Sequence, residues 1–476
     1  MRDRKTDKEP AKGSRKSMKR VSAMIIVMFA VCVGYIVKIV AVDSEDMIIN
    51  SYNPRISSAD TSIKRGDIKD IDGYVFATSE YKDGKYVRKY NGAETSCQVV
   101  GYTGAGKYGI EASENFTLQN IDSELFQRLK SFLTGSEVMG DSVYLTIDKD
   151  LQDLATRLMQ TNKGAVVVEE VSTGRILCMV SKPQFDPQTV TENWDSLKND
   201  ETSPLLNRST QGLYTPGSVF KIVTAVSALR NMPDVYDFSY DCVSEADFEN
   251  KVIHCFNNKA HGTQNIIQGF ANSCNCFFSE IGTKIGAEAL RKTADEMLFN
   301  SGVEFELNSS VPSVPIDGTS SESELVETSI GQGKTTVTPL FMACVAQAIA
   351  NNGIMLKPYI VDHIENYSGI TVSTTIPEQY AQILTSDECS QLKEMMISVV
   401  NEGTGFNAKS DYFQVAGKTG TAENPGGSDH LWFVGFAPAD NPQYAVSVVL
   451  ENNDGSANAS VIARKMLYNT INRDEL

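Results

Sequence analysis

Positive charge is scarce in this sequence of 476 residues, in which 43 lysines and arginines face 60 aspartates and glutamates. The formal net charge of -17 argues against a nucleic-acid-binding protein, because a surface that binds phosphates must supply positive charge to release counterions. The mean hydropathy of -0.22 is too low for a polytopic membrane protein. Repeats are missing, and glycine (34) and proline (15) are near average, which excludes collagen-like and disordered chains. An acidic enzyme or binding protein of about two to four domains remains.

A disulfide framework is also missing. Eight of the nine cysteines follow residue 42, and among them Cys242 and Cys255, which bracket a short segment, are the best candidates for one disulfide. His254, Cys255 and His261 fit no standard zinc spacing. From the sequence we therefore expect neither a metal site nor a cofactor.

Basic residues gather in the first 20 residues, where nine of them face three acidic ones and leave a charge of -23 on the remainder. The next 17 residues, Val21 to Val37, carry no charge, and Lys38 can snorkel so that the span continues through Val42. The pattern predicts a cytoplasmic basic tail (1–20), a transmembrane anchor (21–42) and an extracytoplasmic remainder in the cell envelope. A cleaved signal peptide is the alternative, but its apolar region is usually shorter and ends in an Ala-x-Ala-like site.

Beyond the anchor, residues 43–140 are polar and rich in turns, and a new composition begins near residue 141. Alternating apolar residues predict strands, and apolar residues at helical spacing predict helices on either side of a helix-rich middle, 188–400. The predicted strands cover 143–147, 164–171, 175–181, 412–417, 431–438 and 443–450, with helices after Asp148 and over 457–471. The fold class is therefore α+β, with one antiparallel sheet assembled from distant halves of the chain and flanked by helices.

Ser218 and Lys221 stand at the start of a predicted helix, after the start signals Thr215 and Pro216. A spacing of three places both side chains on one helix face. A serine hydroxyl is a poor nucleophile until a base accepts its proton, and a lysine does so when burial or neighbouring cations lower its pKa. Alone, Ser-x-x-Lys is common and is typical of a solvated helix surface.

Two further motifs change that interpretation. Ser273-Cys274-Asn275 begins 55 residues after Ser218, and Lys418-Thr419-Gly420-Thr421 begins 145 residues after Ser273. In this order the three motifs resemble those of penicillin-binding proteins and serine β-lactamases. Longer segments resemble the class B penicillin-binding transpeptidases, namely 145–155, 164–187, 207–225, 261–278, 329–353 and 403–423. The resemblance covers most of a transpeptidase domain at 141–476.

The resemblance implies a peptidoglycan D,D-transpeptidase that cross-links stem peptides and is a target of β-lactam antibiotics. Ser218 would attack the penultimate D-Ala carbonyl of a D-Ala-D-Ala donor, release the last D-Ala and form an acyl-enzyme. Lys221 would be the base, Ser273 would relay a proton to the departing amine, and Lys418 would supply positive potential near Ser273.

The same resemblance implies four substrate-binding residues. Asn275 would hydrogen-bond the donor's amide backbone, and the hydroxyls of Thr419 and Thr421, on either side of Gly420, would bind its carboxylate. The backbone N–H groups of Ser218 and Thr421 would form the oxyanion hole.

Upstream, segments 64–77 and 106–118 resemble the short pedestal of this class, which implies a domain at 43–140 for dimerisation or partner docking. The resemblance also implies a glycosyltransferase of the SEDS type as the partner. Too few residues precede 141 for a glycosyltransferase domain in this chain, which excludes the bifunctional class A type. Asp70-Ile71-Asp72-Gly73 departs from the usual Asp-Arg-Asn-Gly pattern, which leaves the contacts of that arginine open. The resemblance leaves open whether the role is in cell division, cell shape or sporulation, and it leaves the oligomeric state open.

Two alternatives remain open. A β-lactamase or D,D-carboxypeptidase would hydrolyse its acyl-enzyme, and one Glu-x-x-Leu-Asn string, Glu304 to Asn308, matches the loop that positions water in β-lactamases. A non-catalytic scaffold would regulate the glycosyltransferase instead. Near the final hairpin we expect Trp432 in the core and His430 in a solvated loop.

Overall fold

The computed structural model describes residues 12–41, 63–119, 139–424 and 427–473. They divide into two units, 1–58 and 59–476. The first contributes one helix, α1 (Lys12–Ala41), which includes all of the predicted anchor except Val42, a residue outside the described ranges. In the part of the chain that the structure describes, no helix reaches the length and apolarity needed to cross a membrane. The anchor therefore stays a prediction.

The second unit is built around a five-stranded antiparallel sheet with the order β17-β18-β19-β7-β8. Its strands are β7 (Lys163–Glu170), β8 (Ile176–Lys182), β17 (Ala416–Ala422), β18 (His430–Ala437) and β19 (Tyr444–Glu451). The pairing of β7 with β19 joins the two halves of the sheet that are distant in sequence. It runs from Lys163 opposite Glu451 to Glu170 opposite Tyr444. This confirms the predicted antiparallel sheet assembled from distant halves of the chain, except that the strand predicted at 143–147 lies in a second sheet, as β6 (Ser142–Leu145).

One strand limit was predicted wrongly. The strand expected at 412–417 begins at Ala416, so the Lys-Thr-Gly motif lies inside β17 and not at the end of a strand. Before it, Tyr412 turns its ring onto Tyr468, at a centroid separation of 4.9 Å. Tyr412, which was expected in the strand, therefore contacts the terminal helix instead.

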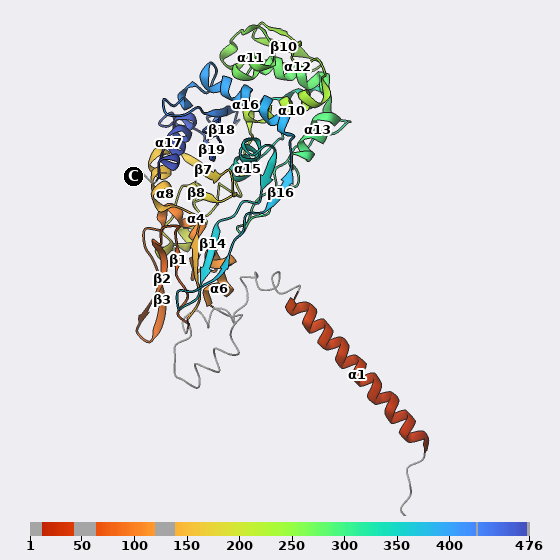
Figure 1. The fold of residues 1–476 in the computed structure, drawn as a ribbon, viewed down its shortest axis with the longest axis vertical. Coiled ribbons are helices and arrows are strands. Elements are labelled where there is room, and N and C mark those ends of the chain that lie inside the picture. Colours follow the sequence, from red (N-terminus) through yellow and green to blue (C-terminus); the bar gives the residue numbers. More distant parts are fainter. Residues whose placement is uncertain (1–11, 42–62, 120–138, 425–426, 474–476) are drawn as a thin grey trace, which may run out of the picture. The chain divides into compact units, whose positions relative to one another are not determined.

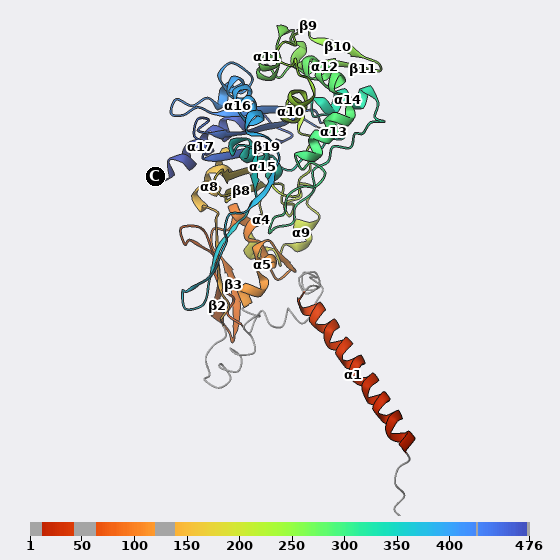
Figure 2. The ribbon, with the colours of Figure 1, turned by 45° about the vertical axis from the view of Figure 1, so that its right-hand side comes forward.

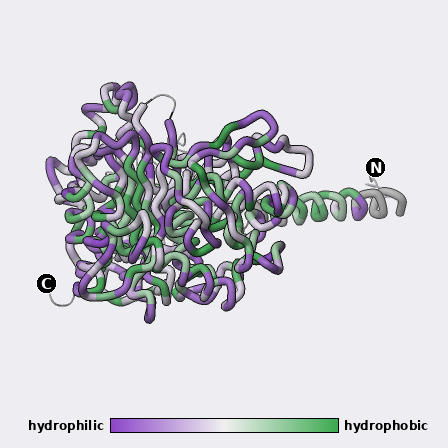
Figure 3. Tube along the Cα trace, turned by 90° about the horizontal axis from the view of Figure 1, so that it is seen from above, coloured by the Kyte–Doolittle hydropathy of each residue, from purple (hydrophilic) through white to green (hydrophobic). Residues whose placement is uncertain are grey.

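Helices cover both faces of this sheet because its strands alternate between two apolar cores. Ala165 and Val167 of β7 belong to the core that includes α15 (Pro339–Ala350), and Val166 and Val168 belong to the core that includes α17 (Ala459–Ile471). The alternation follows from the two-residue period of a strand. Figure 1 shows α15 and α17 on opposite sides of β19, and Figure 3 shows the apolar segments concentrated in the interior of the unit.

A helical region extends from the sheet, and it carries two of the three sequence motifs. Its helices are α10 (Lys221–Asn231), α11 (Ile266–Ala271), α12 (Asn275–Ile285), α13 (Ala287–Glu296), α14 (Glu322–Ser329) and α16 (Ser386–Asn401). Short strands pair beside them, namely β9 (Tyr240–Cys242) with β12 (Gly262–Gln264), β10 (Glu245–Phe248) with β11 (Lys251–His254), and β13 (Ile354–Leu356) with β16 (Gln379–Gln382). In Figure 2, β9 to β11 gather with α11 and α12 at the end of the unit far from β2 and β3.

A second, six-stranded sheet, with the order β15-β14-β6-β1-β2-β3, forms that opposite end. Its strands are β1 (Ile68–Lys69), β2 (Val75–Lys82), β3 (Lys85–Tyr90), β6 (Ser142–Leu145), β14 (Val361–Glu365) and β15 (Thr371–Thr374). Beside it lie α4 (Cys97–Val100), α5 (Ile110–Ser113), α6 (Asn115–Gln119) and the pair β4 (Tyr102–Thr103) and β5 (Lys107–Tyr108). The sheet thus draws strands from both sides of the boundary predicted at residue 140. Helix α8 (Lys149–Leu158), capped by Asp148 as predicted, follows β6.

The usual pedestal pattern has an arginine where this chain has Ile71, and here an arginine from the C-terminal end of the chain lies close to this position. Ile71 packs on the core that includes α17. Arg473 supplies a guanidinium nearby, where it pairs with Asp72 and, at 2.7 Å, with Asp148. Asp70 meanwhile accepts hydrogen bonds from the backbone N–H groups of Asp72 and Tyr74. An arginine distant in sequence therefore occupies this acidic corner.

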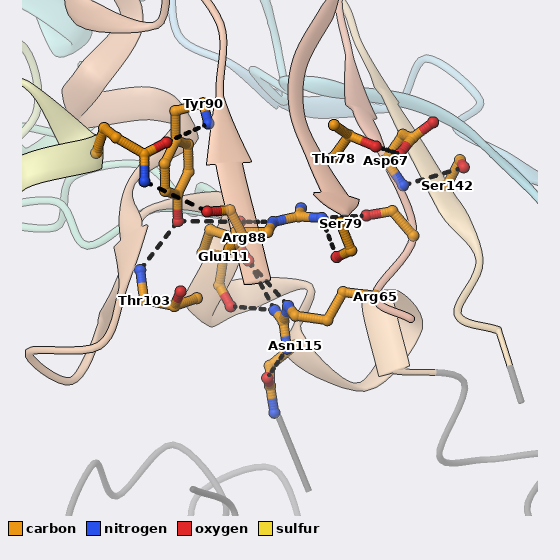
Figure 4. A network of polar contacts seen from close by, with 12 residues as sticks. Arg65, Asp67, Thr78, Ser79, Arg88, Tyr90, Thr103, Glu111, Asn115 and Ser142 are labelled. Atoms are coloured by element: carbon orange, nitrogen blue, oxygen red, sulfur yellow. Dashed lines mark hydrogen bonds and ion pairs between the residues drawn. The ribbon is translucent and has the colours of Figure 1, made fainter. Parts of the chain in front are cut away.

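A buried carboxylate ties together the elements next to the second sheet (Figure 4). Glu111 is fully buried and pairs with Arg65 at 2.8 Å and with Arg88 at 2.5 Å. Arg65 also donates to the Asn115 side chain, and Arg88 to the Gly66 carbonyl. Burial alone would raise the pKa of Glu111, but the two guanidinium groups outweigh it and lower the pKa below the ordinary value.

Replacing Glu111 by glutamine is expected to lower the free energy of unfolding by about 3 to 5 kcal/mol, because two buried guanidinium groups lose their counter-charge. Urea denaturation of the full chain measures it. The matched control is Glu80→Gln in the exposed Glu80–Lys89 pair, expected to cost less than about 1 kcal/mol. Because the folded pKa of Glu111 is lowered, its contribution is fully present above pH about 4.5 and is lost as pH falls through the folded pKa. Equal losses in both variants would contradict this account.

Candidate active site

Ser218 lies in a tight turn that is pressed against β17. The segment Gly217–Phe220 forms a 3-10 helix that leads directly into α10, close to the predicted helix start. Gly217 has φ of +53°, and a Cβ there would lie 2.5 Å from the Thr421 carbonyl oxygen. A left-handed conformation combined with this close approach requires glycine. A side-chain hydrogen bond also supports the turn, because Trp432 Nε1 donates to the Thr215 carbonyl at 3.1 Å.

The Lys221 amine connects the first two motifs. Its Nζ lies 3.1 Å from Ser218 Oγ, which is hydrogen-bonding distance for proton transfer. The same Nζ lies 2.7 Å from Asn275 Oδ1 and 2.7 Å from the Ser273 carbonyl oxygen. Lys221 is fully buried, whereas Ser218 is partly exposed. The nucleophile is therefore partly accessible to solvent, whereas the base is buried.

Ser273 lies between the two lysines of the motifs. Its Oγ accepts from Lys418 Nζ at 2.9 Å and lies 3.3 Å from Lys221 Nζ. The residue has φ of +55°, a conformation that costs a non-glycine residue about 1 to 3 kcal/mol and that clusters at functional sites. The strained backbone directs the Ser273 carbonyl and hydroxyl to the same amine. The structure thus brings together the four predicted catalytic residues.

Burial sets the protonation of both amines. Desolvation lowers the pKa of Lys221 to about 8, and desolvation together with the charge of Lys221 lowers the pKa of Lys418 well below its ordinary value. A neutral Lys221 is then accessible near neutral pH and can accept the Ser218 proton.

Three of the predicted substrate-binding residues lie on β17, at the edge of the sheet, and Asn275 begins α12. A Cβ at Gly420 would lie 2.8 Å from the Pro216 carbonyl oxygen, so β17 lies directly on the nucleophile turn and places Thr421 beside Gly217. Asn275 already uses its amide, because its Nδ2 donates to the His254 carbonyl at 2.9 Å and its Oδ1 accepts from Lys221. It therefore positions Lys221 as well as lining the site.

Sequence reasoning missed Thr404. Its Oγ1 lies 2.6 Å from Thr419 Oγ1, and its backbone N–H donates to the Ala271 carbonyl at 3.1 Å. The only signal in the sequence is a threonine between two glycines after α16. Gly403 lets this loop approach, since a Cβ there would lie 2.1 Å from the Ala271 carbonyl oxygen.

His430 was predicted wrongly and Trp432 correctly. Trp432 is 1% exposed in the core. His430 starts β18, is partly buried and accepts from the Asn452 backbone N–H at 3.0 Å, with its ring edge-on to Tyr214. Burial lowers the pKa of this histidine. It is thus held by strand pairing and not by a solvated loop.

The segment from Glu304 to Asn308, which matches the water-positioning loop of β-lactamases, contacts another part of the fold. Glu304 pairs with Lys357 at 2.9 Å, and Glu306 accepts from the Ile360 backbone N–H at 3.0 Å. Both contacts lie at the β13–β14 connection. Neither glutamate has a described contact with Ser218.

The sequence spacing predicts no metal site, and that expectation stays a prediction, but four potential ligands lie close together in the part of the chain that the structure describes. Cys242, Cys255, His261 and Cys274 place one ligand atom each within 4.8 Å of one another. Irregular sequence spacing concealed this set, because hairpin pairing brings the segments together. Cys242 and Cys255, the predicted disulfide pair, are 3.6 Å apart at sulfur and are both free thiols.

Comparison with known proteins agrees with this arrangement. Residues 164–472 match the family described as the penicillin-binding protein transpeptidase domain, and residues 65–143 match the penicillin-binding protein A dimerisation domain. The chain belongs to the penicillin-binding protein transpeptidases. This confirms the resemblance predicted from the three motifs.

Relatives of this transpeptidase are similar over nearly their whole length. "Peptidoglycan D,D-transpeptidase PbpA" of Mycolicibacterium smegmatis is 31% identical, over 93% of this chain and 95% of its own. Penicillin-binding protein A from M. tuberculosis, solved as an imipenem acyl-enzyme complex, has 30% identity and a TM-score of 0.81, over 86% of this chain and 99% of that one. A D,D-transpeptidase domain from Eggerthella lenta has 30% identity and a TM-score of 0.78, over 87% and 99%.

Substituting Gly217 by alanine is expected to unfold or distort the nucleophile turn, because the new Cβ adds a backbone clash to the strain of a positive φ. The control is Gly369→Ala, since Gly369 has φ of +74° with nothing within 4 Å and carries only the strain of about 1 to 2 kcal/mol. Thermal unfolding of both variants measures the difference. A Gly217 variant no less stable than the Gly369 variant would show that the turn does not need this close approach.

Proposed function

We propose that this protein is a peptidoglycan D,D-transpeptidase that works through a serine acyl-enzyme. Ser218 Oγ attacks the penultimate D-Ala carbonyl of a stem peptide, and its proton passes to Lys221. The C–N bond to the terminal D-Ala then breaks, and an amine of a second stem attacks the acyl-enzyme and releases Ser218. The observation that carries this proposal is the 3.1 Å contact between Ser218 Oγ and the buried, pKa-lowered amine of Lys221.

The proton needed by the departing D-Ala has a path in this geometry. It is held on Lys221 after the attack, and Ser273 Oγ lies 3.3 Å from that amine. Lys418, at 2.9 Å from the same hydroxyl, orients it as a relay. Ser273 delivers the proton to the nitrogen of the leaving D-Ala, so the amine departs neutral. The reverse path deprotonates the amine of the acceptor stem.

Charge on the tetrahedral intermediate is met by backbone donors. The Ser218 and Thr421 N–H groups belong to two closely packed segments, since a Cβ at Gly217 would lie 2.5 Å from the Thr421 carbonyl oxygen. Removal of one such donor in an oxyanion hole costs about 3 to 4 kcal/mol. The Thr419 and Thr421 hydroxyls, supported by Thr404, receive the substrate carboxylate.

The cellular setting belongs to the same proposal. A basic tail (1–20) before an apolar stretch (21–42) supports a single-pass protein with a cytoplasmic N-terminus and an extracytoplasmic catalytic domain. Peptidoglycan stems and β-lactams are then its substrate and inhibitors. The match of 65–143 to a dimerisation domain supports a docking role for the pedestal, with a SEDS-type glycosyltransferase as its partner.

Exposure to a fluorescent penicillin is expected to give an adduct of one drug per chain that persists for hours, because no described carboxylate approaches Ser218 to activate a deacylating water. Intact-protein mass spectrometry of wild type and Ser218→Ala measures it. Fast release of hydrolysed drug would indicate a β-lactamase. A folded wild type without an adduct would leave the scaffold alternative.

The rate constant of this acylation is expected to rise with pH up to about 8 and then level off, because only neutral Lys221 accepts the Ser218 proton. Below that pKa the rate falls about tenfold per pH unit. Stopped-flow fluorescence between pH 6 and 9.5 measures the profile. Lys221→Arg, which cannot lose its proton, is expected to acylate at least about a hundredfold more slowly. A flat profile would exclude Lys221 as the base.

A further inference from the structure

Four potential metal ligands converge directly behind the Ser273 loop. Cys242 ends β9, Cys255 follows β11, His261 precedes β12, and Cys274 caps the start of α12. All four belong to the end of the unit where β9 to β11 gather with α12 in Figure 2. Three of them are fully buried thiols, with exposed fractions of 2% or less.

The spacing of these atoms fits one tetrahedral ion. Cys255 Sγ lies 3.6 Å from Cys242 Sγ and 3.6 Å from Cys274 Sγ, and His261 Nδ1 lies 3.5 Å from Cys242 Sγ. In a tetrahedral zinc site with Zn–S of about 2.3 Å and Zn–N of about 2.0 Å, the ligand atoms are separated by about 3.8 Å and 3.5 Å. Zinc is the ion that three thiolates and one imidazole favour. The observed separations are therefore close to those of a Cys₃His site.

We propose that Cys242, Cys255, His261 and Cys274 bind one Zn²⁺ ion. Four protein ligands leave no open position for water or substrate, so the ion is structural and takes no part in the reaction. The neighbouring Cys276 is not a ligand. Its Sγ lies 3.5 Å from Cys255, but it donates to the Ile253 carbonyl and lies outside the mutually close four.

A disulfide explains the cluster less well. Cys255 is equally distant from Cys242 and Cys274, so the geometry selects neither pair. A Cys242–Cys255 disulfide would leave out Cys274, and a Cys255–Cys274 disulfide would leave out Cys242, so neither bond uses all three thiols. A metal ion uses all four groups at once.

The ion would fix the second catalytic motif, a consequence that rests on the proposed function. Cys274 stands between Ser273, with its strained φ of +55°, and Asn275, which contacts Lys221. Asn275 also donates to the carbonyl of His254, the residue before Cys255. Two ligands therefore clamp the two segments that hold Asn275 and Ser273 against the lysines. All four ligands are positioning residues.

The test is the zinc content of the full chain, purified in detergent under reducing conditions and analysed by elemental mass spectrometry. We expect about one Zn²⁺ per chain in wild type and in the matched control Cys276→Ser, and at least a tenfold loss in His261→Ala and Cys242→Ser. His261 is partly exposed, which makes its variant the least disruptive to folding. Wild type stripped of zinc and loaded with Co²⁺ should show thiolate-to-cobalt charge-transfer absorption.

Three results would overturn the proposal. They are wild type without zinc and without the cobalt band, zinc retained equally by all variants, or a disulfide within the cluster detected as a loss of two hydrogens per chain. These readouts do not involve activity, so failure of the metal site is distinct from failure of the proposed function. For the positioning effect, removal of zinc from folded wild type should slow penicillin acylation by about a hundredfold, as for a catalytic group displaced by about 1 Å. An unchanged rate would exclude that effect.

Discussion

The burial of two lysine amines around one serine hydroxyl is the constraint on which the site depends. Lys221 and Lys418 are both fully buried and both within hydrogen-bonding distance of Ser273 Oγ. Desolvation lowers the pKa of both amines, and the charge of Lys221 lowers the pKa of Lys418 further. A base is thereby available to Ser218 without a histidine or a carboxylate. The packing of the surrounding helices and sheet offsets the free-energy cost of burying both amines.

Close backbone contacts hold the three motifs in place. Gly217 and Gly420 let the nucleophile turn and β17 lie against each other, and Gly403 brings the loop of Thr404 onto the segment before Ser273. Each contact joins residues far apart in sequence, and each leaves no room for a side chain. In the sheet that carries Lys418, the pairing of β7 with β19 joins strands that are distant in sequence.

The same logic extends away from the site. The Glu111 network uses a buried carboxylate to join β3, α5 and the segment before β1. At the corner around Asp70, Arg473 reaches acidic groups from the opposite end of the chain. The zinc proposal adds a third clamp of this kind, behind Ser273. Glu111 is buried together with its two guanidinium partners, whereas Arg473 and Asp72 pair at a partly exposed corner.

The sequence by itself determined the family and the antiparallel sheet, and it predicted the four residues Ser218, Lys221, Ser273 and Lys418 that the structure brings together. Motif order, strand alternation and helix caps such as Asp148 are local signals, and they survive without knowledge of the fold. Only the tertiary structure decided that the Lys-Thr-Gly motif lies within β17, that Thr404 joins the site, and that His430 is held by strand pairing. It also decided that Glu304 and Glu306 face away and that three cysteines and a histidine meet. Those outcomes depend on which distant segments pair, and pairing is set by shape and burial over the whole unit, which no local spacing encodes.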